Sequence, residues 1–383
     1  MIIAFDLTPI YDHLTGVERY NINISKEIIK AHPENKYILI FKKTIHNSFR
    51  EEVKFQNVTH IVIPECNKFI FIQWKLYRVL KKIKADYFVF LSFTSPVLFR
   101  KQRIINAIHD LTCWDCPQSV PIKMKYYYRY TYKVATKVSW KIVTVSRFSQ
   151  KRICEKYKLN EEKVPIIYDG LTDIFKTSLS ENIDIKKKYN LPQEYLLSLS
   201  TIEPRKNLQL LIKAYSELLE EGTELPDLVL AGRQGWKLEE IFTGITEKVK
   251  NHIHFTGFID DEDLPTLYKD AVAFVFPSKY EGFGLPIIEA MSQGTLVISS
   301  DAASLPEVLG EAGLLFQSDN IIDLKNKLQH CMHLNREDKE IMTKIGRDIS
   351  FSFSWELEAE KLYQIMIQNG ENKEDGGCID ESK

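Results

Sequence analysis

Two series of short apolar runs, each run followed by a stretch of helical pattern, limit the fold of this 383-residue chain more than any other feature. A short run without polar alternation predicts a strand buried on both faces, as strands of parallel sheets are. The first series comprises Ile2–Phe5, Tyr37–Phe41, His60–Ile63, Tyr87–Ser92, Ile104–Ile108 and Ile142–Val145. The second comprises Tyr195–Ser200, Leu228–Ala231, Ile253–Phe255, Ala273–Phe276, Leu296–Ser299 and Gly313–Phe316. Helical patterns lie between them at Glu18–Lys30, Ile72–Lys84, Lys123–Thr136, Arg147–Tyr157, Leu208–Leu219, Leu264–Asp270 and Ile322–Cys331. This order predicts an α/β chain with two mostly parallel sheets covered by helices.

The two series are separated by a polar stretch at Asp169–Pro192, where we expect the domain boundary. A chain of this length is too long for one ordinary domain, and the predicted domains span residues 1–175 and 190–352. A last helical pattern covers residues 356–368. Residues 369–383 are polar and rich in glycine, which predicts a disordered tail.

A candidate ligand site follows the apolar run that ends at Phe276. Glu281 begins a glycine turn, Gly282 and Gly284 allow close backbone approach, and a helix is predicted over Leu285–Ser292. The amide groups that begin this helix would face a ligand at the carboxyl ends of the strands, with Glu289 one turn further on. Two solvated surface glutamates are the other interpretation of this pattern.

Three further positions follow predicted strands. Arg205 and Lys206 come after Tyr195–Ser200 and can neutralise a diphosphate, and Asn207 can cap the next helix. Gly16 opens the first helix and lets amides approach a phosphate or an acceptor. His109 and Asp110 end the strand at Ile104–Ile108. Each can also be an ordinary surface or structural residue.

The stretch from Glu281 to Ala290 resembles the acidic motif of retaining glycosyltransferases of the GT-B fold, specifically the large family four that includes bacterial mannosyltransferases. The similarity continues through Gln293–Asp301, Leu305–Val308 and Ala312–Phe316. It implies two Rossmann-like domains that face each other across a cleft, with the last helix crossing back to the first domain.

The resemblance also implies roles for individual residues. It assigns catalysis to His109, beside the transferred sugar, to the phosphate clamp Arg205 and Lys206, and to the sugar-binding Glu281. It assigns the ribose to Glu289. Thr256–Phe258 resembles the loop that holds the nucleotide base. The full donor-binding set is Gly16, Gly257, Phe258, Gly282, Phe283, Gly284, Leu285 and Glu289, and Asp110 either orients His109 or contacts the acceptor. Two positions depart from the family pattern: Ser200 replaces a usual Gly, and Asp169 replaces a commoner Asn.

The function implied is retaining, metal-independent transfer of a hexose from a nucleotide-diphosphate sugar to a glycan or lipid-linked acceptor in surface-polysaccharide synthesis. No cofactor is implied beyond this donor. The pattern is most similar to mannosyltransferases that use GDP-mannose, while glucose, N-acetylglucosamine and rhamnose stay open. A nucleotide-sugar epimerase of related fold and a catalytically silent assembly subunit are the alternatives.

The overall charge of −1 hides an uneven distribution. Residues 1–186 hold 31 Lys and Arg against 18 Asp and Glu, and the remainder holds 20 against 34. Basic residues gather with aromatic ones in Lys68–Lys84 and Lys123–Lys133. Such segments suit an anionic membrane surface, and two solvated helix faces are the alternative. No nucleic-acid motif accompanies them.

Other signals favour a cytoplasmic protein without a metal site. Six scattered cysteines suit a reducing compartment, and Cys113 and Cys116 have no second Cys/His pair. The start of the chain reads as a strand rather than a signal peptide, and no apolar run is long enough to span a bilayer. Asp260–Asp263 precedes a predicted helix, and we expect it to cap that helix.

Overall fold

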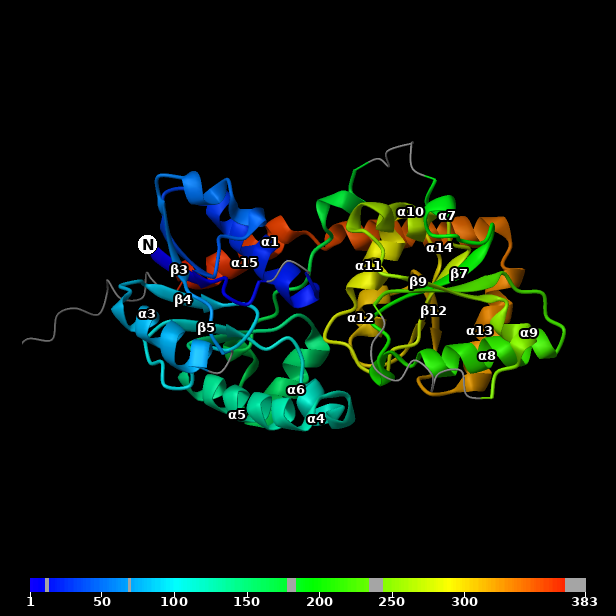
Figure 1. Ribbon diagram of the computed structural model, residues 1–383, viewed down its shortest axis with the longest axis horizontal. Helices are drawn as coiled ribbons and strands as arrows, with labels where there is room; N and C mark the ends of the chain where they lie inside the picture. The colour runs from blue at the N-terminus through cyan, green and yellow to red at the C-terminus, as the bar shows by residue number, and fades with distance from the viewer. Residues whose placement is uncertain (11–13, 68–69, 178–183, 234–243, 369–383) are drawn as a thin grey trace, which may run out of the picture.

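The computed structural model describes residues 1–10, 14–67, 70–177, 184–233 and 244–368. The described part forms two parallel six-stranded sheets flanked by helices, one in each half of the chain (Figure 1). The predicted α/β fold with two facing domains is confirmed. The predicted tail at 369–383 lies outside the described residues.

The first sheet has the order β3-β2-β1-β4-β5-β6. Its strands are β1 (Ile2–Asp6), β2 (Lys36–Lys42), β3 (Val58–Ile63), β4 (Tyr87–Phe90), β5 (Ile104–Ala107) and β6 (Lys141–Val143). The second sheet has the order β12-β11-β10-β7-β8-β9. Its strands are β7 (Tyr195–Leu199), β8 (Asp227–Ala231), β9 (Ile253–Gly257), β10 (Ala273–Phe276), β11 (Val297–Ser300) and β12 (Gly313–Phe316). In each sheet the strand order reverses at one pair, β1 with β4 and β7 with β10, and such points are where open α/β sheets bind ligands.

The longer helices agree with the helical patterns, with one exception. They are α1 (Gly16–Ala31), α3 (Tyr77–Lys82, preceded by a π-helical turn at Phe71–Leu76), α5 (Ile122–Val138), α6 (Arg147–Tyr157), α8 (Leu208–Glu220), α10 (Leu264–Lys269), α11 (Leu285–Ser292), α13 (Ile321–His333), α14 (Arg336–Ser352) and α15 (Trp355–Gln368). Short helices are α4 (Thr112–Asp115), α7 (Ile185–Lys188), α9 (Glu247–Lys250) and α12 (Leu305–Leu309). The exception is α14, which was not predicted and which packs on α11 through Gly346 and Met291.

The C-terminal helix α15 lies against α1 of the first domain, as expected (Figure 1). The ring of His32 stacks on Tyr363 at 3.4 Å between centroids, and His32 Nε2 lies 2.8 Å from a carboxylate oxygen of Glu360. The Tyr87 hydroxyl donates to the carbonyl of Met366. These contacts join α15 to the first domain although its residues follow the second in sequence.

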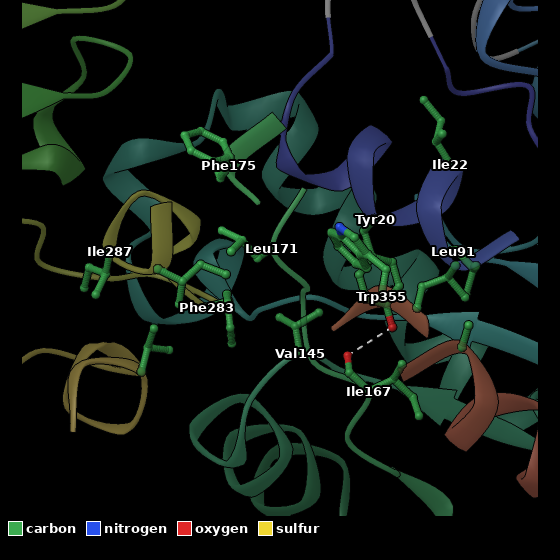
Figure 2. Packing of buried hydrophobic residues seen from close by; sticks show 14 of the residues in the cluster. Tyr20, Ile22, Leu91, Val145, Ile167, Leu171, Phe175, Phe283, Ile287 and Trp355 are labelled. Carbon is green, nitrogen blue, oxygen red and sulfur yellow. Dashed lines mark hydrogen bonds between the residues drawn. The ribbon is translucent and has the colours of Figure 1, made fainter. Parts of the chain in front are cut away.

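A continuous apolar core runs through the seam between the two domains (Figure 2). Tyr20 packs edge-on against Trp355, and its hydroxyl donates to the carbonyl of Ile167 at 3.1 Å. Phe283 contributes from the second domain and packs on Phe353. The seam therefore holds α1, the inter-domain chain and the start of α15 together.

Two capping predictions are right in position but wrong in the hydrogen bond. Asn207 is the residue before α8, but it has a left-handed φ of +56° and donates its side-chain amide to Asp319 instead of accepting from the helix. Asp263 is the residue before α10, but it and Asp260 accept from Lys188 and not from the first amides of the helix. In both cases a distant partner competes for the side chain.

Among the described residues, we find no helix with the length and apolar composition needed to cross a bilayer.

Candidate donor-sugar site

A cavity of about 510 Å³ lies between the carboxyl ends of the two sheets. The segments that line it follow β1, β5, β7, β8, β9 and β10, so both sheets face it with their ligand-binding edges. It brings together these predicted residues: Gly16, His109, Asp110, Arg205, Lys206, Phe258, Glu281, Gly282, Phe283, Gly284, Leu285 and Glu289. Gly257 is the one predicted residue outside its lining.

Glu281 is paired with both predicted clamp cations. One carboxylate oxygen accepts from Arg205 at 2.7 Å, and the other accepts from Lys206 Nζ at 2.6 Å. Arg205 also donates to Glu203 at 2.7 Å and to the carbonyl of Tyr280 at 2.7 Å. The loops after β7 and β10 are thereby tied together by buried charge.

In this cluster each charged group favours the ionised form of its oppositely charged partner. Burial alone would raise the pKa of the Glu281 carboxyl, but Arg205 and Lys206 outweigh burial and lower it to about 2. Burial lowers the pKa of the Lys206 ammonium, and Glu281 opposes this effect. The pKa of Arg205 is raised, since Glu281 and Glu203 outweigh its burial. Glu281 is therefore ionised at any ordinary pH.

Glycines fix the start of α11. Gly284 has a φ of +119°, a conformation that L side chains rarely adopt, and it directly precedes the helix. A Cβ on Gly282 would lie 2.8 Å from the carbonyl oxygen of His109 in the other domain. Pro286 lies in the first turn, where its missing N–H costs nothing. The first amides of α11 are thus held at the cavity wall.

Glu289 lies one turn into α11 and is buried. The hydroxyl of Tyr268 donates to its carboxylate at 2.9 Å. Burial raises the pKa of Glu289, while Arg19 and Tyr268 lower it to a smaller extent. Its second oxygen keeps acceptor capacity for a hydroxyl.

His109 is oriented by a backbone group and not by Asp110. Its Nε2 lies 2.7 Å from the carbonyl of Leu91, which can only accept, so Nε2 carries a proton. Burial lowers the pKa of His109, and the neutral ring then presents Nδ1 as an acceptor. Asp110 accepts from the amide of Thr112 at 2.7 Å instead. Of the two roles expected for Asp110, orienting His109 has no contact to support it.

Gly16 begins α1 at the opposite wall. Thr15 and Glu18 cap this helix reciprocally, and a Cβ on Gly16 would lie 3.3 Å from Leu285 of α11. The N-termini of α1 and α11 therefore approach each other across the cavity. Two such helix starts favour an anion between them.

The ring of Phe258 lies at another part of the lining, half exposed, and the turn that carries it includes Gly257, with a φ of +73°. The sequence did not single out Arg233, whose guanidinium lies 5.1 Å from the centre of the Phe258 ring. Arg233 lies in the loop after β8 as Arg205 lies in the loop after β7, and this shared placement is the signal that could have found it. Arg19 and Asp261, also unpredicted, form an ion pair of 2.7 Å between the domains. By contrast, the ring of Phe283 packs on Tyr168 and Phe353.

Comparison with known proteins identifies the class and then the family. Two solved structures share this two-domain architecture and show the fold. Anabaena HepE in complex with UDP-glucose has a TM-score of 0.72 at 16% identity, covering 96% of this chain and 100% of that one. WaaG, a glycosyltransferase involved in lipopolysaccharide biosynthesis, has a TM-score of 0.70 at 16% identity, covering 95% and 99%. The fold is that of a GT-B-type protein.

The model of the family described as glycosyl transferases group 1 matches residues 180–348. O-antigen chain mannosyltransferase B of Escherichia coli is 30% identical over 375 residues, covering 93% of this chain and 97% of that protein. O-antigen chain mannosyltransferase RfbU of Salmonella typhimurium is 29% identical over 252 residues, covering 66% and 67%. This chain belongs to the glycosyl transferases group 1 family, and its class of reaction is glycosyl transfer.

The Glu281 pairing predicts a specific stability effect. Glu281→Gln should lower the free energy of unfolding by about 3 kcal/mol at pH 7, because it leaves Lys206 buried without a counter-charge. In the unsubstituted protein this stabilisation is present above pH 4.5 and is lost as pH falls toward about 2. Urea unfolding measures both the effect of the substitution at pH 7 and the pH dependence of the unsubstituted protein.

The matched control is Glu203→Gln, which leaves Arg205 its contact with Glu281. Glu203→Gln should lower the free energy of unfolding by less than half as much as Glu281→Gln does. Inorganic pyrophosphate should raise the unfolding temperature more in Glu281→Gln than in the unsubstituted protein, because Lys206 loses its carboxylate partner and Arg205 loses one of its two. Equal unfolding curves for the two variants would contradict the central place of Glu281.

Proposed function

We propose that this protein is a retaining hexosyltransferase that moves mannose from GDP-mannose to a hydroxyl of a glycan or lipid-linked acceptor in surface-polysaccharide synthesis. The observation that carries the proposal is the meeting of Arg205, Lys206 and Glu281 beside the start of α11. Cations, helix amides and a carboxylate are what a diphosphate joined to a sugar requires. The names of the E. coli and Salmonella relatives support mannose as the sugar.

In the proposed reaction the acceptor hydroxyl oxygen bonds to C1 of the donor sugar as the bond from C1 to the diphosphate oxygen breaks. The attack comes from the face of the leaving group, so the anomeric configuration is retained. The hydroxyl proton passes to a phosphate oxygen of the leaving group. Arg205, Lys206 and the amides of α11 stabilise the charge that grows on the diphosphate.

The other residues then have positions in the same scheme. Phe258 and Arg233 would hold the base, and Glu289 would accept from ribose hydroxyls. Glu281 and the neutral His109 would accept from hydroxyls of the transferred sugar. The described side chains offer this chemistry without a metal ion, and we propose that none is needed.

A nucleotide panel tests the donor. GDP should raise the unfolding temperature of the purified protein, whereas UDP, TDP and ADP should not, and EDTA should not alter the result. If UDP alone raises the unfolding temperature, the donor is a UDP-sugar and the proposed GDP-mannose is wrong. If no nucleotide raises the unfolding temperature, the proposed transferase activity is contradicted.

Removing either clamp cation should slow transfer. Arg205→Ala or Lys206→Ala should lower kcat/KM by about 30- to 1000-fold, which corresponds to about 2–4 kcal/mol for one preorganised donor to the developing charge. Lys279→Ala is the control, because Lys279 is more exposed and pairs with Asp319. Steady-state assays with GDP-mannose and acceptor measure the effect. Near-normal transfer by either clamp variant would remove that residue from the proposed mechanism.

The proposal includes contact between the first domain and an anionic membrane surface at its cytoplasmic side. The two basic aromatic segments lie next to each other, since Gln73 donates to the hydroxyl of Tyr127 at 3.3 Å. Ile70, Trp74, Tyr126 and Tyr130 of these segments are exposed, as is the adjacent Ile122; Trp74 is exposed by 55% and Tyr126 by 61%. Lys81, Lys82, Lys84, Lys123 and Lys133 are exposed on the same segments. Exposed aromatic groups among lysines are what such a surface binds.

Charge reversal tests this contact. Lys81→Glu with Lys82→Glu should weaken binding to vesicles of anionic phospholipid at least tenfold at low salt, because each basic residue near the surface contributes about 1 kcal/mol. The control is Lys269→Glu with Lys344→Glu, two exposed lysines of the second domain. Cosedimentation measures binding. An equal effect of both pairs would point to net charge and against a specific face.

A further inference from the structure

Asp169 is a cavity residue that the scheme above does not use. It lies in the chain between the domains, flanked by Ile167 and Leu171, which Figure 2 shows at the seam. The backbone around it is held on both sides: Tyr168 N donates to Glu358 at 2.9 Å, and Leu171 N donates to Phe353 at 2.8 Å. A Cβ on Gly170 would lie 2.5 Å from the backbone nitrogen of Trp355. The position of Asp169 is therefore fixed by the fold.

Asp169 as a residue is only 6% exposed, and among the described residues its carboxyl makes no hydrogen bond or ion pair. The other acids of the cavity all have partners. Glu281 and Glu203 bind cations, Asp261 binds Arg19, Glu289 accepts from Tyr268, and Asp110 accepts from Thr112. A buried polar group without a partner is costly, so Asp169 is the cavity acid that a bound ligand would satisfy.

The groups that face Asp169 are acidic or already paired. Glu289 of α11 and Glu358 of α15 both act on it, and Tyr20 of α1 lies close enough to be affected by it. Lys361 is bound to Glu358 at 2.6 Å, and Arg19 is bound to Asp261. Beyond Tyr20 lies His109, which burial keeps neutral. Burial, then Glu358 and Glu289, raise the pKa of Asp169 to about 8.

We propose that Asp169 binds the nucleotide-diphosphate donor as a neutral carboxylic acid, donating its O–H to an oxygen of the ligand and accepting through its carbonyl. A neutral carboxyl offers the same donor and acceptor pair as the side-chain amide of Asn. An ionised carboxylate would repel the diphosphate. The inference rests on the proposed function, because it takes the donor as the ligand.

Calorimetric titration of GDP between pH 7 and 9.5 tests it with three proteins. The affinity of the unsubstituted protein should fall about tenfold per pH unit above about pH 8, since only the protonated form binds. Asp169→Asn should keep the affinity seen at pH 7 across this interval. Asp169→Leu, of similar size but without polar atoms, should bind at least tenfold more weakly throughout. Lys206 is common to all three proteins, so the difference between profiles reports Asp169.

Two results would overturn the inference while leaving the proposed function intact: GDP binding by Asp169→Asn that is as weak as by Asp169→Leu, or identical pH profiles for Asp169→Asn and the unsubstituted protein. If Asp169→Leu does not fold, this second comparison decides alone. Failure of the unsubstituted protein to bind GDP, UDP, TDP or ADP at any pH would overturn the proposed donor class and this inference with it.

Discussion

The pairing of Glu281 with Arg205 and Lys206 is the interaction on which the rest of the site depends. It joins the loops after β7 and β10, the two strands at which the second sheet reverses its order. Three charges in a buried place are tolerated only because each has a partner. With the loops tied, the first turn of α11 has a fixed position relative to the two cations. The two cations and the start of α11 are therefore positioned before any ligand arrives, and a diphosphate would replace Glu281 as the partner of the cations.

The contacts between the domains include polar and aromatic ones. Arg19 pairs with Asp261, the hydroxyl of Tyr280 donates to Asp115, and Glu307 accepts from the first amides of α6. At the seam Tyr168, Phe283 and Phe353 pack together, and the hydroxyl of Tyr168 also donates to Glu307. Water can replace polar contacts at little cost, whereas separating the aromatic rings would expose apolar surface. A movement of the domains would therefore break the Arg19–Asp261 pair at the cavity more readily than the aromatic packing.

Much of this could be predicted from sequence because parallel strands bring their carboxyl ends to one edge. The twelve apolar runs all correspond to strands in the described part of the chain, and residues that follow β1, β5, β7, β8, β9 and β10 meet in one cavity. The predictions that failed concern features that depend on distant parts of the chain. Helix α14 has a mostly polar sequence, and Asn207 forms its contact with Asp319 only after folding. Arg233 follows a strand as Arg205 does, but only the fold brings it to the ring of Phe258. The raised pKa of Asp169 could not be predicted either, because Glu358 lies near it only when α15 crosses back to the first domain.

These positions explain how a cavity rich in acids can receive an anion. Its lining includes Glu203, Glu281, Glu289, Asp110, Asp169 and Asp261, together with Arg19, Arg205, Lys206 and Arg233. The ion pairs cancel most of these charges, since Arg19 neutralises Asp261 and the Arg205–Lys206 pair balances Glu203 and Glu281. With Asp169 neutral, Arg233 and the N-termini of α1 and α11 supply the positive field that remains, against the carboxyl groups of Asp110 and Glu289. A diphosphate that displaces Glu281 from the clamp then frees that carboxylate for sugar hydroxyls. This one exchange, in which the diphosphate replaces Glu281 on the two cations, would complete both the diphosphate-binding and the sugar-binding parts of the donor site.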